Sequence, residues 1–205
     1  MSQTRPRAEF PVDGLPAGDA VRLMKTMLVP RPIAWVGSRS AEGVANLAPH
    51  SFFTMVSNEP PILVVSSTGR KDTLTNVETM GQFTVSIIDR ALAEAANATS
   101  AVVGPEVDEF ALGGLEAEPG VAVDAPRVAA SPAVFECVLD RTVEAGDGVV
   151  MFGRVVHLAV AEDVLVTDAR GHRLPDARRL DPVTRLGRNE WGGLGEVFAF
   201  DRPGA

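Results

Sequence analysis

The segment NLAPHSFFTMVSNEPP, from Asn46 to Pro61, holds a histidine next to a serine, a pair that could support nucleophilic catalysis. Adjacent side chains of an extended segment point to opposite faces, so His50 and Ser51 are poorly placed to share a hydrogen bond. The sequence also contains no G-x-S-x-G motif. Hydrolytic chemistry is therefore disfavoured, and no residue is predicted to be catalytic.

The sequence gives no support for a metal centre either. His50, His157 and His172 stand apart, without a His-x-His or HExxH spacing, and Cys137 is the single cysteine. We therefore expect no metal. One cysteine also excludes an internal disulfide and suits the reducing cytoplasm.

A better chemical signal is SSTGRKDT, which follows the apolar run PILVV. Its hydroxyls, its lysine and the free amides of a following helix would together bind an anion. The predicted anion-binding residues are Ser66, Ser67, Thr68, Lys71 and Thr73. Asp72 is expected to cap a helix that ends at Gly81. An ordinary Ser/Thr-rich turn is the alternative, since neither a Walker loop nor G-x-G-x-x-G is present.

The stretch NLAP, just before His50, has properties suited to one side of a flat heterocycle. Asn46 offers a donor and an acceptor, Ala48 permits close approach, and Pro49 fixes the backbone. We expect this stretch to lie near the anion-binding loop, because it precedes one strand and the next strand along the chain leads into that loop.

Composition bounds the remaining possibilities. The 205 residues are 45% apolar and 22% charged, which fits one soluble globular domain. A net charge of −8 repels nucleic acid and anionic lipid. The N-terminus has no apolar stretch after its arginines and the longest apolar run is strand-length, so we expect neither a secretory signal nor a membrane span, and a cytoplasmic location.

The distribution of 19 glycines and 15 prolines between short apolar runs predicts many short strands. The expected helices cover residues 72–80, 90–101 (capped by Asp89) and 106–112. The expected strands cover residues 27–38, 51–57, 62–67, 82–88, 133–143, 149–161, 164–167 and 196–200. This pattern predicts a mainly β fold, a closed or nearly closed barrel with two or three short helices.

Between residues 20 and 203 the chain resembles the flavin reductase-like family of FMN-binding split-barrel proteins. The segments that carry the resemblance are LVPRPIAWVGSRSAEGVANLAPHSFFTMVSNEPPILVVSS, KDTLTNVETMGQFTVSI, GRVVHLAV and RLGRNEWGGLGEVFAFDRP. The resemblance implies one Greek-key-like split-barrel domain over residues 1–205, with an N-terminal extension at 1–18 and a C-terminal loop and last strand at 180–205. It also implies a homodimer with flavin near the subunit interface.

The resemblance assigns site residues as well. Those expected to hold the flavin are Asn46, Leu47, Ala48, Pro49, Ser51, Ser66, Ser67, Thr68, Lys71, Asp72, Thr73 and Arg188. His50 and Trp191 are expected on the substrate side, although Trp191 also suits simple packing of the C-terminal loop. The implied cofactor is FMN, with FAD possible.

Members of this family commonly transfer hydride from NADH or NADPH to flavin and supply reduced flavin to a partner monooxygenase. The flavin carries that chemistry, which agrees with the lack of a catalytic dyad. One alternative is a tightly FMN-bound protein that acts as an electron carrier or oxygenase on a small redox substrate. Another is a split-barrel binding module without flavin, which the Ser/Thr/Lys loop disfavours.

One position departs from the family pattern. Many NADH-dependent members have Gly-Asp-His before the GRV strand, whereas this chain has Gly146, Asp147 and then Gly148. Asp147 and Gly148 suit a hairpin turn. The missing imidazole leaves the nicotinamide donor open.

Overall fold

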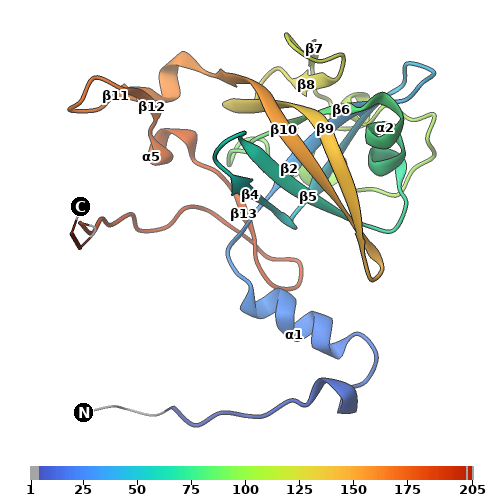
Figure 1. Ribbon diagram of the computed structural model, residues 1–205, viewed down its shortest axis with the longest axis vertical. Coiled ribbons are helices and arrows are strands. Elements are labelled where there is room, and N and C mark those ends of the chain that lie inside the picture. The colour runs from blue at the N-terminus through green and yellow to red at the C-terminus, as the bar shows by residue number, and fades with distance from the viewer. Residues whose placement is uncertain (1–4, 202, 205) are drawn as a thin grey trace.

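The centre of the molecule is a seven-stranded antiparallel sheet in the order β3-β2-β6-β9-β10-β5-β4 (Figure 1). The computed structural model describes residues 5–201 and 203–204. The strands of this sheet are β2 (Ala34–Arg39), β3 (Ala45–His50), β4 (Phe53–Ser57), β5 (Ile62–Thr68), β6 (Gln82–Ser86), β9 (Ala133–Ala145) and β10 (Gly148–Val160). The mainly β prediction is confirmed.

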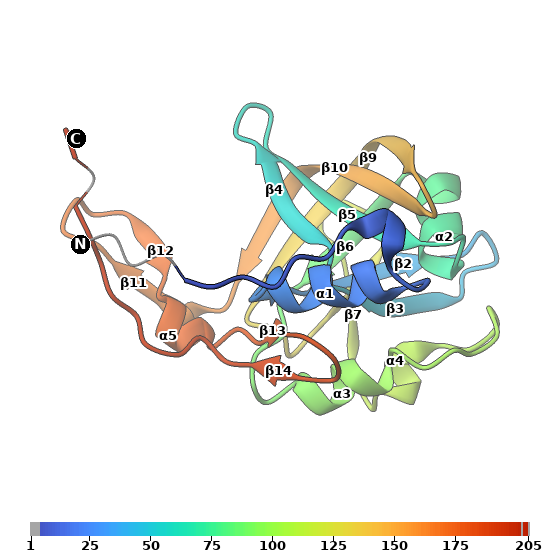
Figure 2. The ribbon, with the colours of Figure 1, turned by 90° about the horizontal axis from the view of Figure 1, so that it is seen from below.

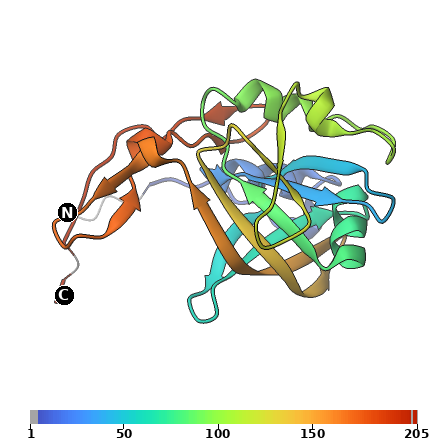
Figure 3. The same cartoon turned by 90° about the horizontal axis from the view of Figure 1, so that it is seen from above.

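The sheet curls around an apolar core to which most of its strands contribute (Figure 3). Phe83, Val65 and Met151 are fully buried there, and a Cβ at Gly153 would lie 2.4 Å from Cζ of Phe83. Only glycine therefore allows β10 to approach that ring. The edge strands β3 and β4 are not hydrogen-bonded to each other, so the barrel is open along this seam rather than closed.

A second core lies on the other face of β2 and β3, under two short helices, α3 (Ala93–Ala98) and α4 (Glu109–Leu112). Trp35 is fully buried there and donates its indole N–H to Thr99 Oγ1 at 2.9 Å. The predicted helix at 90–101 is shorter than expected, because Asp89 caps a turn at the amide of Leu92 instead of starting the helix.

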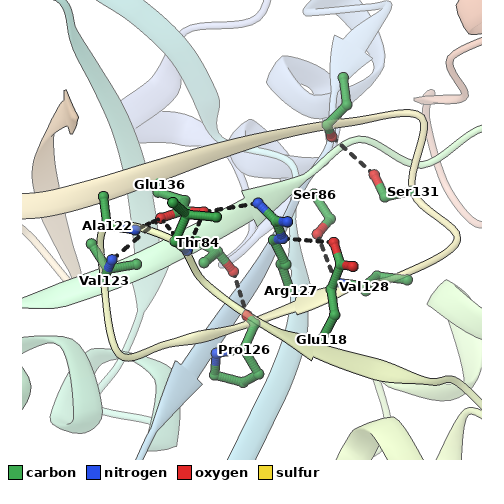
Figure 4. Close-up of polar contacts among 12 residues, drawn as sticks. Thr84, Ser86, Glu118, Ala122, Val123, Pro126, Arg127, Val128, Ser131 and Glu136 are labelled. Atoms are coloured by element: carbon green, nitrogen blue, oxygen red, sulfur yellow. Dashed lines mark hydrogen bonds and ion pairs between the residues drawn. The ribbon is translucent and has the colours of Figure 1, made fainter. Parts of the chain in front are cut away.

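The loop between β7 (Ala117–Pro119) and β8 (Pro126–Val128) is tied to the sheet by Glu136 (Figure 4). This carboxylate is fully buried and accepts the amides of Val121, Ala122 and Val123. Arg127 donates to it at 2.9 Å and pairs also with Glu118 at 2.6 Å. The buried charge is thus paired and hydrogen-bonded, as its burial requires.

Several elements lie outside the barrel (Figure 2). Helix α1 (Asp19–Met27) lies below it in the view of Figure 1 and has no buried residue. The remaining elements are the 3-10 helices η1 (Val12–Gly14) and η2 (Glu162–Val164), together with β1 (Arg31–Pro32), β11 (Leu165–Thr167), β12 (Arg173–Pro175), α5 (Ala177–Leu180), β13 (Thr184–Arg185) and β14 (Trp191–Gly192). Together with α2 (Asp72–Met80), the described part of the chain has five α-helices, more than the two or three expected. None of the described helices is long and apolar enough to cross a bilayer.

The predicted strand at 196–200 is wrong. This segment has no ladder partner among the described residues, and Phe198 and Phe200 are 72% and 88% exposed. The expectation for 51–57 needs a smaller correction, since the strand begins at Phe53 after a bend at Ser51 and Phe52. Parts of the predicted extension and tail, residues 1–4, 202 and 205, lie outside the described residues.

Candidate functional site

A cavity of about 470 Å³ opens beside β3, β5 and the start of α2. The segment from Thr99 to Val103 forms its other side, and Lys25 of α1 reaches its rim. The residues that line it are Lys25, Asn46, Ala48, Pro49, His50, Ser51, Phe52, Ser66, Ser67, Thr68, Lys71, Asp72, Thr73, Thr99, Ser100, Ala101, Val102, Val103 and Glu109. The two sequence motifs, NLAPHS and SSTGRKDT, therefore meet in one cavity.

Strand β3 forms one wall and is an edge of the sheet. Leu47 donates its amide to Oε2 of Glu109 at 3.2 Å instead of to β2. Because amide direction alternates along a strand, the backbone at Pro49 also points away from β2, where a proline costs no ladder bond. The carbonyls of Leu47 and Pro49 face the same open side, so they are acceptors for the N–H group of a flat ligand.

The start of α2 forms the anion-binding end of the cavity. Its N-cap is Lys71, without a side-chain cap, and Asp72 is the first helical residue, so the prediction that Asp72 caps the helix is wrong. By contrast, α4 and α5 are capped by Asp108 and Asp176, whose carboxylates each accept two backbone amides. The amides of α2 are left for a ligand, and an uncapped helix start beside a lysine suits a phosphate.

Hydroxyl groups surround this helix start. Thr73 is buried and its Oγ1 lies 3.5 Å from Oδ1 of Asn46, which joins α2 to β3. Ser67 is also buried and donates to the carbonyl of Gly69 at 3.0 Å. That bond holds the turn in which Gly69 has a φ of 74°, a conformation that glycine adopts without strain.

His50 lies at the other end of β3 and has an unusual environment. Its Nε2 is buried and has no hydrogen-bond partner among the described residues. Burial lowers the pKa of His50 to about 4, the Ser66 backbone acts in the opposite sense, and the Lys71 charge lowers it further. The ring is therefore neutral at pH 7. Because its buried Nε2 has no partner among the described residues, it is available to form a hydrogen bond with a group of a ligand.

Arg31 connects the cavity to the outer elements. Its guanidinium donates to the carbonyls of Leu28 at 2.8 Å and Leu186 at 2.9 Å, and Nε lies 3.5 Å from Oγ of Ser51. One side chain thus holds the end of α1, the β13–β14 loop and the bend after β3. This role was not predicted from the sequence.

Most of the predicted site residues line the cavity, but three do not. Leu47 points into the second core and contributes its backbone only. Arg188 lines a different hollow, beside α1, with a φ of 55°. Trp191 packs against the second core with Arg185 over its ring, at 5.6 Å from the centroid, so the packing alternative describes its position in this chain.

Other residues of the cavity were missed. Glu109 is 6% exposed and Thr99 is 2% exposed, and they lie within the predicted helices at 106–112 and 90–101, for which no role in the site was predicted. The helix predicted at 106–112 starts only at Glu109, and the Asp108 cap is the signal that could have placed Glu109 in its first turn.

The turn before β10 also differs from the prediction. Gly146, with a φ of 62°, and Asp147 form the two-residue loop, and Gly148 is already the first residue of the strand. Gly148 pairs with Thr68, and a Cβ there would lie 3.3 Å from Oγ of Ser66. The position where many family members carry histidine is therefore next to Ser66, whose hydroxyl group is part of the cavity lining.

The chemistry of the lining residues fits a flavin phosphate: open amides, one adjacent cation and hydroxyls at one end, and backbone acceptors beside small residues along β3. Among the described residues, no three His, Cys, Asp or Glu side chains gather as a metal site would need. The site is thus equipped to hold and orient a ligand.

The chain is similar in sequence and fold to several proteins of known structure. Component B of nitrilotriacetate monooxygenase from Bacillus cereus is 31% identical, with a TM-score of 0.87 over 96% of this chain and 100% of that chain. Flavoredoxin of Desulfovibrio vulgaris is 28% identical, with a TM-score of 0.77 over 86% and 93%. A split-barrel protein from Shewanella frigidimarina, 18% identical, has a TM-score of 0.83 over 93% and 95%, which shows the fold alone.

The fold is thus a split β-barrel, as the resemblance implied. The family model described as "Flavin reductase like domain" matches residues 24–174, which include every strand of the central sheet. The chain belongs to the flavin reductase-like domain family.

Proposed function

We propose that this protein is an FMN-binding oxidoreductase that transfers hydride from NADH or NADPH to flavin. The observation that carries the proposal is the uncapped start of α2, with Lys71 as its N-cap, at one end of a cavity whose wall is the open edge of β3. A phosphate at the helix start and a ring against β3 use both features with one ligand.

The protein's contribution is position and electrostatic field. Bound flavin supplies the hydride chemistry. Lys71 and the first amides of α2 would hold the phosphate, and the small Ala48 and Pro49 would let the ring approach the backbone. Thr99 to Val103 line the opposite side of the cavity. A terminal phosphate dianion matches this anion-binding end, which is why FMN is proposed rather than FAD.

The electron donor is tested by mixing the purified protein with NADH or NADPH and FMN and following the absorbance of the reduced nicotinamide. We expect oxidation that depends on both flavin and protein. Flavin that stays bound but causes no nicotinamide oxidation would instead favour the alternative, an electron carrier or oxygenase. The similarity to flavoredoxin supports keeping that alternative.

A partner monooxygenase is part of the proposal. The similarity to component B of a two-component monooxygenase supports it, at 31% identity over nearly the whole chain. Reduced flavin would pass to that oxygenase or to a small redox substrate in the cytoplasm. A coupled assay would test this step, by measuring whether reduced FMN formed by this protein sustains turnover of an added oxygenase.

We also propose that the protein forms a homodimer. Its accessible surface is 12,885 Å², whereas a monomeric protein of this mass exposes about 9,200 Å². The difference between these two areas, about 3,700 Å², exceeds the surface that each partner buries in an obligate dimer, about 1,000–2,500 Å². An apolar groove lined by Phe53, Met55, Leu63, Phe135, Val155 and Leu158 is the face we assign to the second copy.

A further inference from the structure

Glu109 is a buried carboxyl group inside a cavity that is otherwise suited to an anion. It is 6% exposed and lines the cavity from the first position of α4. Its Oε2 accepts the Leu47 amide at 3.2 Å, which ties the carboxyl group to β3. The same group borders the cavity, so it can also contact a ligand there.

The charges that face Glu109 are mostly of its own sign. Burial raises the pKa of Glu109, the amides of Leu47 and of Glu109 itself lower it, and the nearby carboxylates of Asp72 and Asp108 raise it again. Asp72 lies on α2, at the anion-binding end, and Asp108 lies on Glu109's own segment. The cations of the cavity are Lys71 and Lys25, and His50 is neutral.

An ionised Glu109 would oppose the ligand that the rest of this end is built to hold. A phosphate dianion placed at the start of α2 adds two negative charges near a carboxyl that already faces Asp72. A protonated carboxyl removes that repulsion and gains a hydrogen-bond donor. The protonated form is thus the one that suits a phosphate ligand.

We infer that Glu109 is a further ligand-binding residue, which takes up a proton from solvent when a phosphate-bearing ligand enters the cavity and donates it in a hydrogen bond to that ligand. The inference rests on the proposed function, because it needs a phosphorylated flavin at this site. By linkage, proton uptake and a fall in affinity with rising pH are the same quantity.

The test is isothermal titration calorimetry of FMN binding in two buffers with different ionisation enthalpies, at about pH 8, where the free phosphate is already a dianion. The buffer dependence gives the number of protons taken up. Glu109→Gln keeps an acceptor for the Leu47 amide but cannot take up a proton. The matched control is Glu106→Gln, an exposed carboxyl of the same segment that does not line the cavity.

Wild type and Glu106→Gln should take up more protons per FMN than Glu109→Gln, by up to about one. Riboflavin, which has no phosphate, should remove this difference. The same comparison of FMN and riboflavin on wild type tests the inference without any variant, if Glu109→Gln does not fold.

Two results would overturn the inference, and they are distinguishable. FMN that binds with equal proton uptake in wild type and Glu109→Gln contradicts the role of Glu109 but leaves the proposed function standing. Failure of FMN to bind to the wild type at all contradicts the proposed function, and the role of Glu109 with it.

Discussion

Lys71 is the residue on which the anion-binding end depends most. It occupies the N-cap of α2 and lines the cavity, whereas its neighbour Arg70 forms an ion pair with Glu78. Replacing Lys71 with Met should raise the Kd for FMN about 10- to 100-fold, because a charge-assisted contact to phosphate is lost. The Kd for riboflavin should not change.

Flavin fluorescence quenching measures both constants. Arg70→Met is the control, since it removes a cation one position away that does not line the cavity. Equal losses of FMN affinity in the two variants would contradict a specific role for Lys71.

His50 affects stability at low pH rather than the affinity for flavin. Its pKa is lowered to about 4 in the folded protein, mainly by burial, while the unfolded chain titrates near 6.5. Between these values the unfolded state binds more protons, so the free energy of unfolding falls as the pH falls, by up to about 3 kcal/mol at pH 4. His50→Ala should lose less stability over this range and should still bind FMN.

Urea denaturation of wild type and His50→Ala at several pH values between about 4 and 7 checks this expectation. Equal slopes of stability against pH in the two proteins would show that the imidazole is not buried as described. Complete loss of flavin from the variant would mean that His50 is essential for cofactor binding.

At the residue scale, the sequence predicted most of the cavity because the two motifs carry their own chemistry. The motif SSTGRKDT contains hydroxyls, a lysine and the start of a helix, which predict an anion site. The motif NLAP combines small residues and a proline, which predict a backbone that a flat ligand can approach. Glu109 and Arg31 were missed for a physical reason: their partners are main-chain groups, Leu47 N–H and the carbonyls of Leu28 and Leu186, and these leave no pattern in the sequence.

At the element scale, the β7–β8 loop depends on one buried carboxylate. Burial acts to raise the pKa of Glu136, but the amides of Val121 and Ala122 and the charges of His157 and Arg127 outweigh it, so the pKa is lowered. Glu136→Gln leaves Arg127, whose side chain is 13% exposed, with Glu118 alone. We expect a loss of about 2–4 kcal/mol in the free energy of unfolding at neutral pH.

The sign of the pH effect follows from the lowered pKa. The stabilisation by Glu136 is present above the ordinary glutamate pKa and is lost as the pH falls through the lower folded value. The difference between wild type and Glu136→Gln in urea denaturation should therefore shrink in acid. A difference that is absent at neutral pH would contradict the account of this loop.

The secondary-structure elements could be predicted from the sequence where their side chains contribute to the core of the barrel. Strands β5, β6, β9 and β10 have apolar runs that a curled sheet requires. Helix α1 was not predicted, and it buries no residue. The strand at 196–200 was wrong because the apolar Phe198 and Phe200 are exposed and the segment has no pairing strand among the described residues.

At the scale of the whole molecule, the large exposed surface predicts self-association. Met55 and Leu158 are 64% and 60% exposed on the apolar groove, so a charge there costs little in the isolated chain. Sedimentation equilibrium should give twice the chain mass of 21.6 kDa for wild type. Met55→Glu and Leu158→Glu should shift the protein toward the monomer by disrupting the apolar face.

Leu112→Glu is the control, because Leu112 is 45% exposed on α4, on the opposite side of the barrel from β4 (Figure 2). A wild-type protein that stays monomeric would contradict the dimer. Equal dissociation of all three variants would show that the groove is not the contact face.

Titration of the flavin-free protein with FMN and with riboflavin, followed by flavin fluorescence, tests whether the cavity between β3 and α2 binds a flavin by its phosphate. We expect saturation at one FMN per chain and an affinity for FMN at least about tenfold above that for riboflavin. Fluorescence that does not change with either ligand, or equal affinity for both, would contradict this expectation.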